Sequence, residues 1–462
     1  MKRITCWLLL VSVGQFVGAQ DLTHPTDMGL PESNFVRPDP SDYQTVLENG
    51  LTAYVARADQ VPLVTLSAFI RVGTVDDDKQ GAAESLLESL RHSGPANLSP
   101  DEFTATLKAM TADYVVEMHD EWTEISLNVP VEDLHLAMTL FAGVVRTPGI
   151  SSENISKVAL AVVPEANDLQ GEDGPALYEG SLTATVDRFR DLIYADHPYG
   201  SKPSGDDFDE LSVADVTEFH ATYFVPGNVV LSIAGDLDID AMHQEVAKQF
   251  GSWSRQDVSK PPTIVPAVGS KTRQHSFPAE KLQSWLVFGH HLPLVPDRDQ
   301  ASLEVMNYIL AGGHLWTRMT IETRYKYGYT NDASGFLTQK WFGPGTYDFR
   351  SYSRPEVIKP IYKNMLDQIF RIRDEEVSVE ELFVAVGALT EGTFQIQYLD
   401  GYSAARNFAL EYLRYRNHER SASYVDRIRA VTGKDVLAAA RKYLRPDEMQ
   451  IVLVGRPENL LN

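Results

Sequence analysis

The chain has 462 residues, with 64 acidic and 41 basic side chains and a formal net charge of −23. An acidic surface of this size repels phosphate backbones, which excludes nucleic acid as a partner and hints at basic peptides. Single hydrophobic cores stop growing at roughly 250–300 residues, so the length indicates more than one domain.

The first 19 residues have the three parts of a secretory signal peptide. Lys2 and Arg3 precede an apolar run, and the segment 17–19 ends on Ala19 as a cleavage site requires. The run is shorter than the roughly 20 residues of a membrane-spanning helix. We therefore expect an exported protein, periplasmic or secreted, with no membrane span after cleavage.

The cysteine content excludes a further group of functions. The one cysteine, Cys6, lies inside the signal segment, so cleavage leaves the mature chain without a thiol. Disulfides, thiolate catalysis and cysteine-ligated metals are excluded for that mature chain.

The segment 81–89 has the spacing of an inverted zinc-protease helix without its histidines. In H-x-x-E-H, two histidines at i and i+4 hold the metal, and a Glu at i+3 polarises the attacking water. The same spacing here gives Ser85, Glu88 and Ser89. A serine hydroxyl is a poor neutral ligand for Zn²⁺, so we expect the candidate base to remain and the metal site to be lost.

The chain repeats its pattern at a separation of 220 residues. Each copy reads as a helix, a proline turn, an apolar strand and a glycine. A duplicated domain of about 220 residues explains the correspondence. The recurring residues are Asp215, Val216, Tyr223, Pro226 and Gly235, which match Asp435, Val436, Tyr443, Pro446 and Gly455.

The boundary between the copies is expected at 254–274, where prolines and a glycine interrupt a polar stretch. We therefore expect two homologous α+β domains, each a mainly antiparallel sheet with helices packed on one face. The expected division is a signal peptide at 1–19, an N-terminal domain at 20–253, the linker at 254–274 and a C-terminal domain at 275–462.

In their order and spacing, these segments resemble the M16 zinc metallopeptidases, the pitrilysin/insulinase group that includes the mitochondrial processing peptidase. The likeness extends over nearly the whole mature chain, and it implies two M16-type halves of which only the first carries a zinc helix. The segments that carry it are 47–51, 81–89, 197–200, 223–236, 312–313, 317–319 and Arg324.

The resemblance also places a third zinc ligand. In the family this is a Glu on a later helix, and Glu165 lies close to the required separation. Pro164 precedes it, and a proline inside a helix costs roughly 3 kcal/mol. We therefore expect the helix to break there and Glu165 to be a solvated first-turn acid.

A second alignment, on Gly81, moves the motif by one residue and gives Glu84, Leu87 and Glu88. Either frame lacks both histidines. This frame could still offer two carboxylates, so Glu84, Glu88 and Glu165 remain candidates for binding a harder cation.

In the second half, family members use an Arg and, seven residues later, a Tyr to hold the substrate carbonyl. Arg324 matches the Arg, Asn331 stands at the Tyr position, and Tyr329 lies two residues short of it. Asn can still donate a hydrogen bond to a carbonyl. Arg318 is a further substrate-binding candidate, and a surface-cation role for both arginines stays open.

We therefore expect an M16-like protein that is inactive on its own and holds no zinc. The resemblance implies a non-catalytic subunit, paired with an active M16 subunit that carries H-x-x-E-H and zinc, which helps to enclose and bind peptide substrates. Two alternatives stay open: a stand-alone periplasmic peptide-binding or chaperone-like protein, and an active metallopeptidase with an atypical carboxylate metal site.

Overall fold

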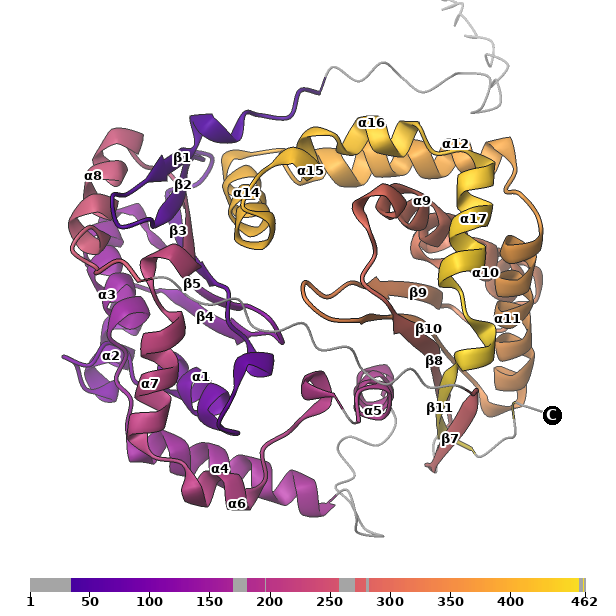
Figure 1. The fold of residues 1–462 in the computed structure, drawn as a ribbon, viewed down its shortest axis with the longest axis horizontal. Helices are drawn as coiled ribbons and strands as arrows, with labels where there is room; N and C mark the ends of the chain where they lie inside the picture. Colours follow the sequence, from indigo (N-terminus) through magenta and orange to yellow (C-terminus); the bar gives the residue numbers. More distant parts are fainter. Residues whose placement is uncertain are drawn as a thin grey trace, which may run out of the picture. The chain divides into compact units, whose positions relative to one another are not determined.

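The computed structural model describes residues 35–168, 181–195, 197–256, 271–279, 282–456 and 460 (Figure 1). The expected signal peptide and most of the expected linker lie outside these residues. Within these ranges, no helix has both the length and the apolar content that crossing a bilayer requires.

The first half forms a sheet that has six strands within the described residues, in the order β1-β2-β6-β3-β5-β4. β2 and β6 are parallel, and the other neighbours are antiparallel. The strands are β1 (Gln44–Val46), β2 (Thr52–Arg57), β3 (Leu63–Ile70), β4 (Asp113–Met118), β5 (Thr123–Pro130) and β6 (Val229–Gly235).

Helices of the same half cover one face of this sheet. Leu86 and Leu90 of α1 pack into one buried cluster with Leu66 of β3 and Leu231 of β6, because alternate strand residues point to the same face. The helices of this half are α1 (Ala82–His92), α2 (Pro100–Ala109), α3 (Leu134–Arg146), α4 (Ser152–Asp168), α5 (Leu182–Ile193), α6 (Gly205–Glu210), α7 (Val213–Tyr223) and α8 (Ile239–Phe250).

Helix α4 continues past Pro164 as one helix. The break expected at this proline was therefore wrong. A proline removes one helical hydrogen bond, while the turns on either side keep theirs. The side chain of Glu165, the proposed third ligand, lies outside the described residues.

The second half forms a sheet with the same strand order. Across the described residues it has five strands, β7-β11-β8-β10-β9, in which β7 and β11 are parallel. The strands are β7 (Arg273–Pro278), β8 (Ser284–Leu292), β9 (Ala333–Thr338), β10 (Gly345–Ser353) and β11 (Gln450–Gly455). The helices are α9 (Asp297–Asn307), α10 (Arg318–Thr320), α11 (Ile358–Asp374), α12 (Val379–Gly387), α13 (Phe394–Ile396), α14 (Gly401–Tyr415), α15 (Glu419–Ala422), α16 (Tyr424–Arg429) and α17 (Gly433–Tyr443).

The sequence repeat is a repeat of geometry. Helices α7 and α17 both begin with a capping box, formed by Ser212 with Asp215 in α7 and by Thr432 with Asp435 in α17. In each box the side chains satisfy backbone N–H groups that the first turn leaves unpaired. A short 3₁₀ turn and then a central strand follow both helices. The predicted duplication is confirmed.

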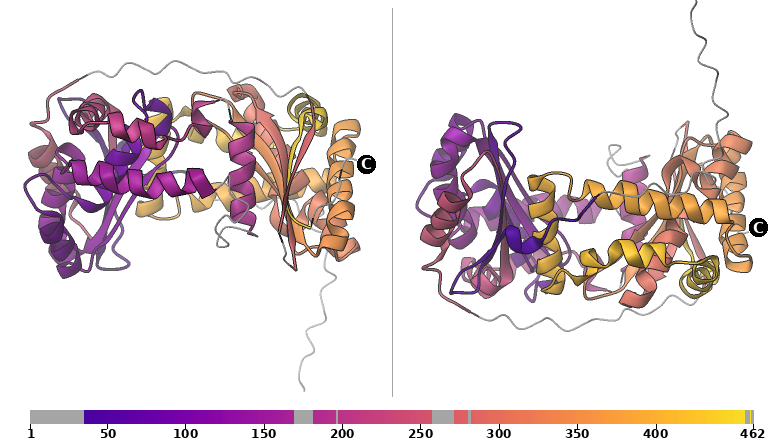
Figure 2. Two further views of the ribbon diagram at one scale, coloured as in Figure 1. Left: turned by 90° about the horizontal axis from the view of Figure 1, so that it is seen from below. Right: turned by 90° about the horizontal axis from the view of Figure 1, so that it is seen from above.

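Each half contributes one helix that packs on the sheet of the other half. Helix α14 covers the face of the first sheet that its own helices leave open, and α5 covers the equivalent face of the second sheet (Figures 1 and 2). Phe408 of α14 lies in one buried cluster with Tyr54 of β2. Phe189 of α5 lies in another with Trp285 of β8. Helices α5 and α14 occupy equivalent positions of the repeat, so each half completes the core of the other.

Candidate functional site

The helix at the motif position is α1, and both of its motif serines are 0 % exposed. The Ser89 hydroxyl donates to the backbone carbonyl of Ser85 at 2.8 Å. Its hydrogen is therefore already used in a bond within the helix. The Ser85 hydroxyl has no hydrogen-bond partner among the residues that the structure describes. Two buried hydroxyls do not fit zinc, which takes imidazole, thiolate or carboxylate ligands.

The remaining motif residue, Glu88, lies near the surface. Its Oε2 is 3.7 Å from Nε2 of His92, one turn further along the same helix. Among the residues that the structure describes, no group of three or more His, Asp or Glu side chains is placed to hold a metal ion.

The carboxyl groups of Glu84 and Asp77 lie near each other at the start of α1, and each affects the pKa of the other. Oδ2 of Asp77 accepts the backbone N–H groups of Gly81 at 2.8 Å and Ala83 at 3.3 Å. Burial raises the pKa of Asp77 to about 7, and the charge of Glu84 contributes to this rise. Burial also raises the pKa of Glu84. The pair therefore holds a proton more tightly than exposed carboxyl groups do.

We expect Asp77→Asn to flatten the pH dependence of stability. An unfolded Asp titrates near pH 4, and the folded group titrates near 7, so the folded state binds this proton more tightly. Its stabilising contribution is complete below about pH 4 and is lost as the pH rises through 7. Urea unfolding of the wild type should show a loss of about 2–4 kcal/mol over this range that the variant lacks.

The matched control is Asp78→Asn, which changes the exposed neighbouring carboxylate. This variant should keep the slope of the wild type. Identical slopes for Asp77→Asn and the wild type would show that the folded state does not hold the proton at Asp77.

A cavity of about 420 Å³ opens beside α1, and both halves line it. Glu84 lines it from α1, Met118 from the end of β4, and Lys340 from the turn between β9 and β10. The candidate catalytic helix therefore faces a space that the second half helps to close.

Glu121 fixes the second half to the first at this cavity. It lies in the turn between β4 and β5 and is 4 % exposed. Its carboxylate accepts the backbone N–H groups of Trp341 at 2.6 Å and Phe342 at 2.8 Å, and the Tyr199 hydroxyl at 2.7 Å. Charge-assisted bonds of this kind are roughly twice as strong as neutral ones.

Asp120 adds two ion pairs to the same contact, one with Lys340 and one with Arg190 of α5. Trp122, which follows Glu121, stacks on Trp341 with ring planes 2° apart and centroids 6.0 Å apart. The turns at 120 and 340 are equivalent positions of the repeat. The sequence analysis did not predict this contact. The sequence feature that could have indicated it is the pair of adjacent acids, Asp120 and Glu121, beside Trp122 in a hairpin turn.

Arg324 lies half-exposed on the π-helical segment η9 (Ile321–Lys326). Its Nη1 donates to the backbone carbonyl of Asn331 at 3.0 Å, so the two residues expected to act together are in contact. The guanidinium lies 5.8 Å from the ring centroid of Tyr325, and in the described part of the chain it forms no ion pair. The third member of the expected arm, Tyr329, stacks on Tyr327 at 5.2 Å.

Arg318 has a different environment. It is 7 % exposed and binds Glu381 through two parallel bonds, Nε to Oε1 at 2.6 Å and Nη2 to Oε2 at 2.8 Å. This bidentate pair joins α10 to the first turn of α12. Arg318 is therefore an interior ion-pair residue, not a surface cation, and Arg324 is the stronger candidate for contacting a peptide.

Comparison with known proteins decides the family. Residues 54–193 match the family described as Insulinase (Peptidase family M16), and residues 210–389 match Peptidase M16 inactive domain. The chain belongs to the M16 peptidase family. The second match begins in the last part of the first half and extends into the second half. With the two sheets of equal strand order, the two matches confirm the expected pair of M16-type α+β domains.

Three similar proteins illustrate the relationship. The zinc protease PqqE of Helicobacter pylori is 22 % identical over 59 % of this chain and 62 % of its own length. A peptidase M16 inactive domain from Pseudomonas fluorescens has a TM-score of 0.75 at 19 % identity, over 90 % of this chain and 98 % of that one. The periplasmic protease PqqL from Escherichia coli has a TM-score of 0.70 at 13 % identity, over 99 % of this chain and 49 % of its own. This chain thus spans about half the length of PqqL.

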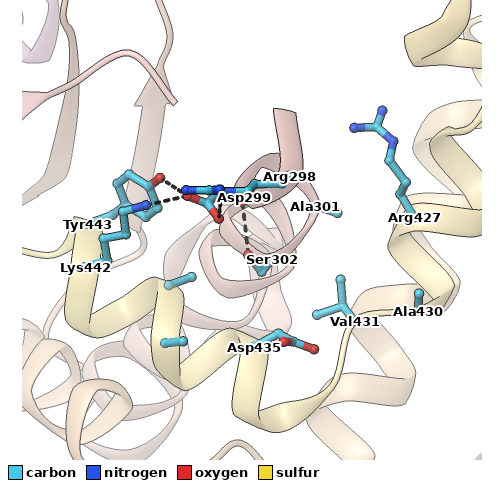
Figure 3. Close-up of a pocket in the computed structure, with 12 residues that line it drawn as sticks. Arg298, Asp299, Ala301, Ser302, Arg427, Ala430, Val431, Asp435, Lys442 and Tyr443 are labelled. Carbon is cyan, nitrogen blue, oxygen red and sulfur yellow. Dashed lines mark hydrogen bonds and ion pairs between the residues drawn. The ribbon is translucent and has the colours of Figure 1, made fainter. Parts of the chain in front are cut away.

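A second cavity of the M16 fold lies between α9, α16 and α17 and has a volume of about 440 Å³ (Figure 3). There Asp299 accepts bonds from Lys442 at 2.5 Å and from the Tyr443 hydroxyl at 2.6 Å. The first half has Lys79 at the equivalent position, where it pairs with Asp215 at 2.7 Å. The change from Lys to Asp removes that bridge in the second half. Because other side chains of the protein neutralise Asp299, we assign no ligand to this cavity.

Proposed function

We propose that this chain is the exported, non-catalytic subunit of a heterodimeric M16 zinc peptidase, and that it helps to enclose and bind peptide substrates. The proposal depends on α1, which has the motif spacing but carries buried serines at 85 and 89 in place of ligands. A fold that keeps the catalytic helix without its ligands can shape a chamber and bind a peptide without cleaving it.

Strand β4 supports peptide binding. It stands at one edge of the first sheet as the described residues form it, and Asp113, Val115 and Glu117 are exposed along it. An edge strand presents backbone N–H and C=O groups with which an extended peptide can pair. Met118, at the end of β4, lines the cavity beside α1. A peptide on this edge would therefore lead into that cavity.

The proposed partner is an M16 subunit with an intact H-x-x-E-H helix, which supplies the zinc and the catalytic Glu. This chain would contribute Arg324 to the closed chamber. Export is supported by the signal-like segment at 1–19 and by the periplasmic location that the name of PqqL gives for that protein.

We expect the purified chain to contain no stoichiometric zinc, because the two motif positions of α1 carry serine instead of histidine and both hydroxyls are buried. The measurement is metal analysis by mass spectrometry after a chelator wash, with the partner subunit as the positive control. About one zinc per chain that survives the wash would contradict the proposal. It would favour the alternative in which Glu84, Glu88 and Glu165 form a carboxylate metal site.

The stand-alone peptide-binding protein remains the second candidate. It is favoured by the cavity beside α1, which residues of one chain line from both halves. Size-exclusion chromatography with the M16 partner separates the two roles. A stable 1:1 complex supports the subunit, whereas two separate monomers that each bind peptide support the stand-alone protein.

A further inference from the structure

Three arginines without an acidic partner gather where the two halves meet. Arg71 follows β3, and Arg414 and Arg416 lie at the end of α14. None of the three forms an ion pair in the described part of the chain, and their close contacts are with aromatic rings. The chain has 64 acidic and only 41 basic side chains. Three unpaired arginines in one place therefore need an explanation.

The turn between β9 and β10 positions two of these arginines. The guanidinium of Arg71 lies 4.7 Å from the ring centroid of Phe342, and that of Arg414 lies 5.8 Å from the nearest ring of Trp341. Arg414 also donates from Nη2 to the backbone carbonyl of Lys340 at 3.1 Å. Because this turn is bound to the turn between β4 and β5, the fold holds both arginines in place.

Two of the three positive charges, those of Arg71 and Arg416, repel each other. Arg416 is exposed at the surface, but partial desolvation of its guanidinium lowers its pKa, and the positive charge of Arg71 contributes to the decrease. Arg416 also has a φ of 59°, in the left-handed region that is costly for residues other than glycine. The site therefore combines repulsion between like charges with a strained backbone position.

The carboxylates nearest to these arginines do not neutralise them. Burial lowers the pKa of Arg71 and that of Arg414. The negative charge of Asp76 opposes the decrease in the pKa of Arg71, and the charges of Glu121 and Asp297 oppose that of Arg414. None of these carboxylates forms an ion pair with either arginine. Glu121 is occupied by the turn between β9 and β10. Asp297 forms its ion pair with a different arginine.

We infer that Arg71, Arg414 and Arg416 form a binding site for the carboxylate groups of an acidic peptide segment. A guanidinium matches a carboxylate with two parallel N–H groups, and one anion can relieve the repulsion between two neighbouring arginines. The inference rests on the proposed function, in which peptides are the substrates, and it specifies their charge. The negative net charge of the whole chain favours basic peptides, whereas the positive charge of these three arginines favours acidic ones.

The test is fluorescence anisotropy on the full chain without a partner, at low ionic strength. The probes are a labelled peptide that alternates Glu with Gly and a matched peptide with Gln in place of Glu. The Glu peptide should bind at least about tenfold more tightly, and Arg71→Gln and Arg416→Gln should each weaken its binding by about tenfold. The control is Arg371→Gln, since Arg371 is exposed on α11 and pairs with Glu375. It should leave binding unchanged.

Thermal unfolding separates binding from a structural role. Removing a repelled cation should leave Tm of Arg416→Gln equal to or above that of the wild type at low ionic strength, while binding of the Glu peptide falls. Equal affinity for the Glu and Gln peptides, or an equal loss in Arg371→Gln, would overturn the inference. Binding of citrate without any binding of the Glu peptide would overturn it too, because it would indicate a site for small free anions.

This experiment is independent of the proposed subunit role. If the Glu peptide fails to bind while the chain still activates a partner, the inference alone is wrong. If the peptide binds but no partner is activated, the anion site stands and the subunit proposal fails.

Discussion

Adding this chain to the proposed M16 partner should raise the rate of peptide hydrolysis, and Arg324→Ala should remove most of that gain. Arg324 is half-exposed, forms no ion pair within the described residues and is steadied by the carbonyl of Asn331 at 3.0 Å. A guanidinium placed at a developing oxyanion stabilises the transition state, and removal of such a donor costs on the order of 10²-fold in rate. The measurement is turnover of a quenched-fluorescence peptide at equal complex occupancy.

The matched control is Lys326→Ala, which removes a cation from the same segment. Lys326 pairs with Glu322 at 2.9 Å and so is already neutralised. This variant should keep most of the gain. Equal rates for the wild type and Arg324→Ala would show that Arg324 is only a surface cation.

Glu121→Ala should lower the free energy of unfolding by about 3–5 kcal/mol. The substitution removes the acceptor of two backbone N–H groups in the turn between β9 and β10, and of the Tyr199 hydroxyl. Buried donors that lose their acceptor carry the full cost of desolvation. Urea unfolding followed by tryptophan fluorescence measures the change.

The control for this prediction is Glu117→Ala on strand β4, close to the same turn. The Glu117 side chain is exposed, so its removal should change stability by less than about 0.5 kcal/mol. If Glu121→Ala were equally harmless, the contact between the two turns would not hold the halves together.

The repeat and the fold could be predicted because local chemistry specifies them. Asp215 and Asp435 each complete a helix cap, and Pro226 and Pro446 each begin the turn that follows. The same backbone requirements select the same residues at both positions. Residues that recur at a constant separation of 220 therefore indicate a duplicated structure.

The contacts between the halves could not be predicted, because they depend on residues far apart in sequence. Nothing near Arg318 indicates its ion pair with Glu381, and nothing near α14 indicates that it packs on the sheet of the other half. The error at Pro164 has a different cause. A local propensity was treated as decisive, although a helix can continue through a proline at the loss of one hydrogen bond.

The candidate site was predictable in part. The spacing of Ser85, Glu88 and Ser89 located the helix, and the structure adds that both serines are buried. Arg324 contacts the backbone of Asn331, while the substrate-binding role that the family resemblance implies for both residues stays a prediction. The cluster of Arg71, Arg414 and Arg416 had no local sequence signal, since its members come together only when α14 crosses to the first half.

Peptide hydrolysis by this chain alone, by the M16 partner alone and by their 1:1 mixture, each with and without a chelator, tests the subunit role most directly. An M16 protein with an intact H-x-x-E-H motif, encoded beside this chain or co-purified with it, is the partner to use. We predict no hydrolysis by this chain alone and chelator-sensitive hydrolysis by the mixture at a rate well above that of the partner. Chelator-sensitive hydrolysis by this chain alone would contradict the subunit role.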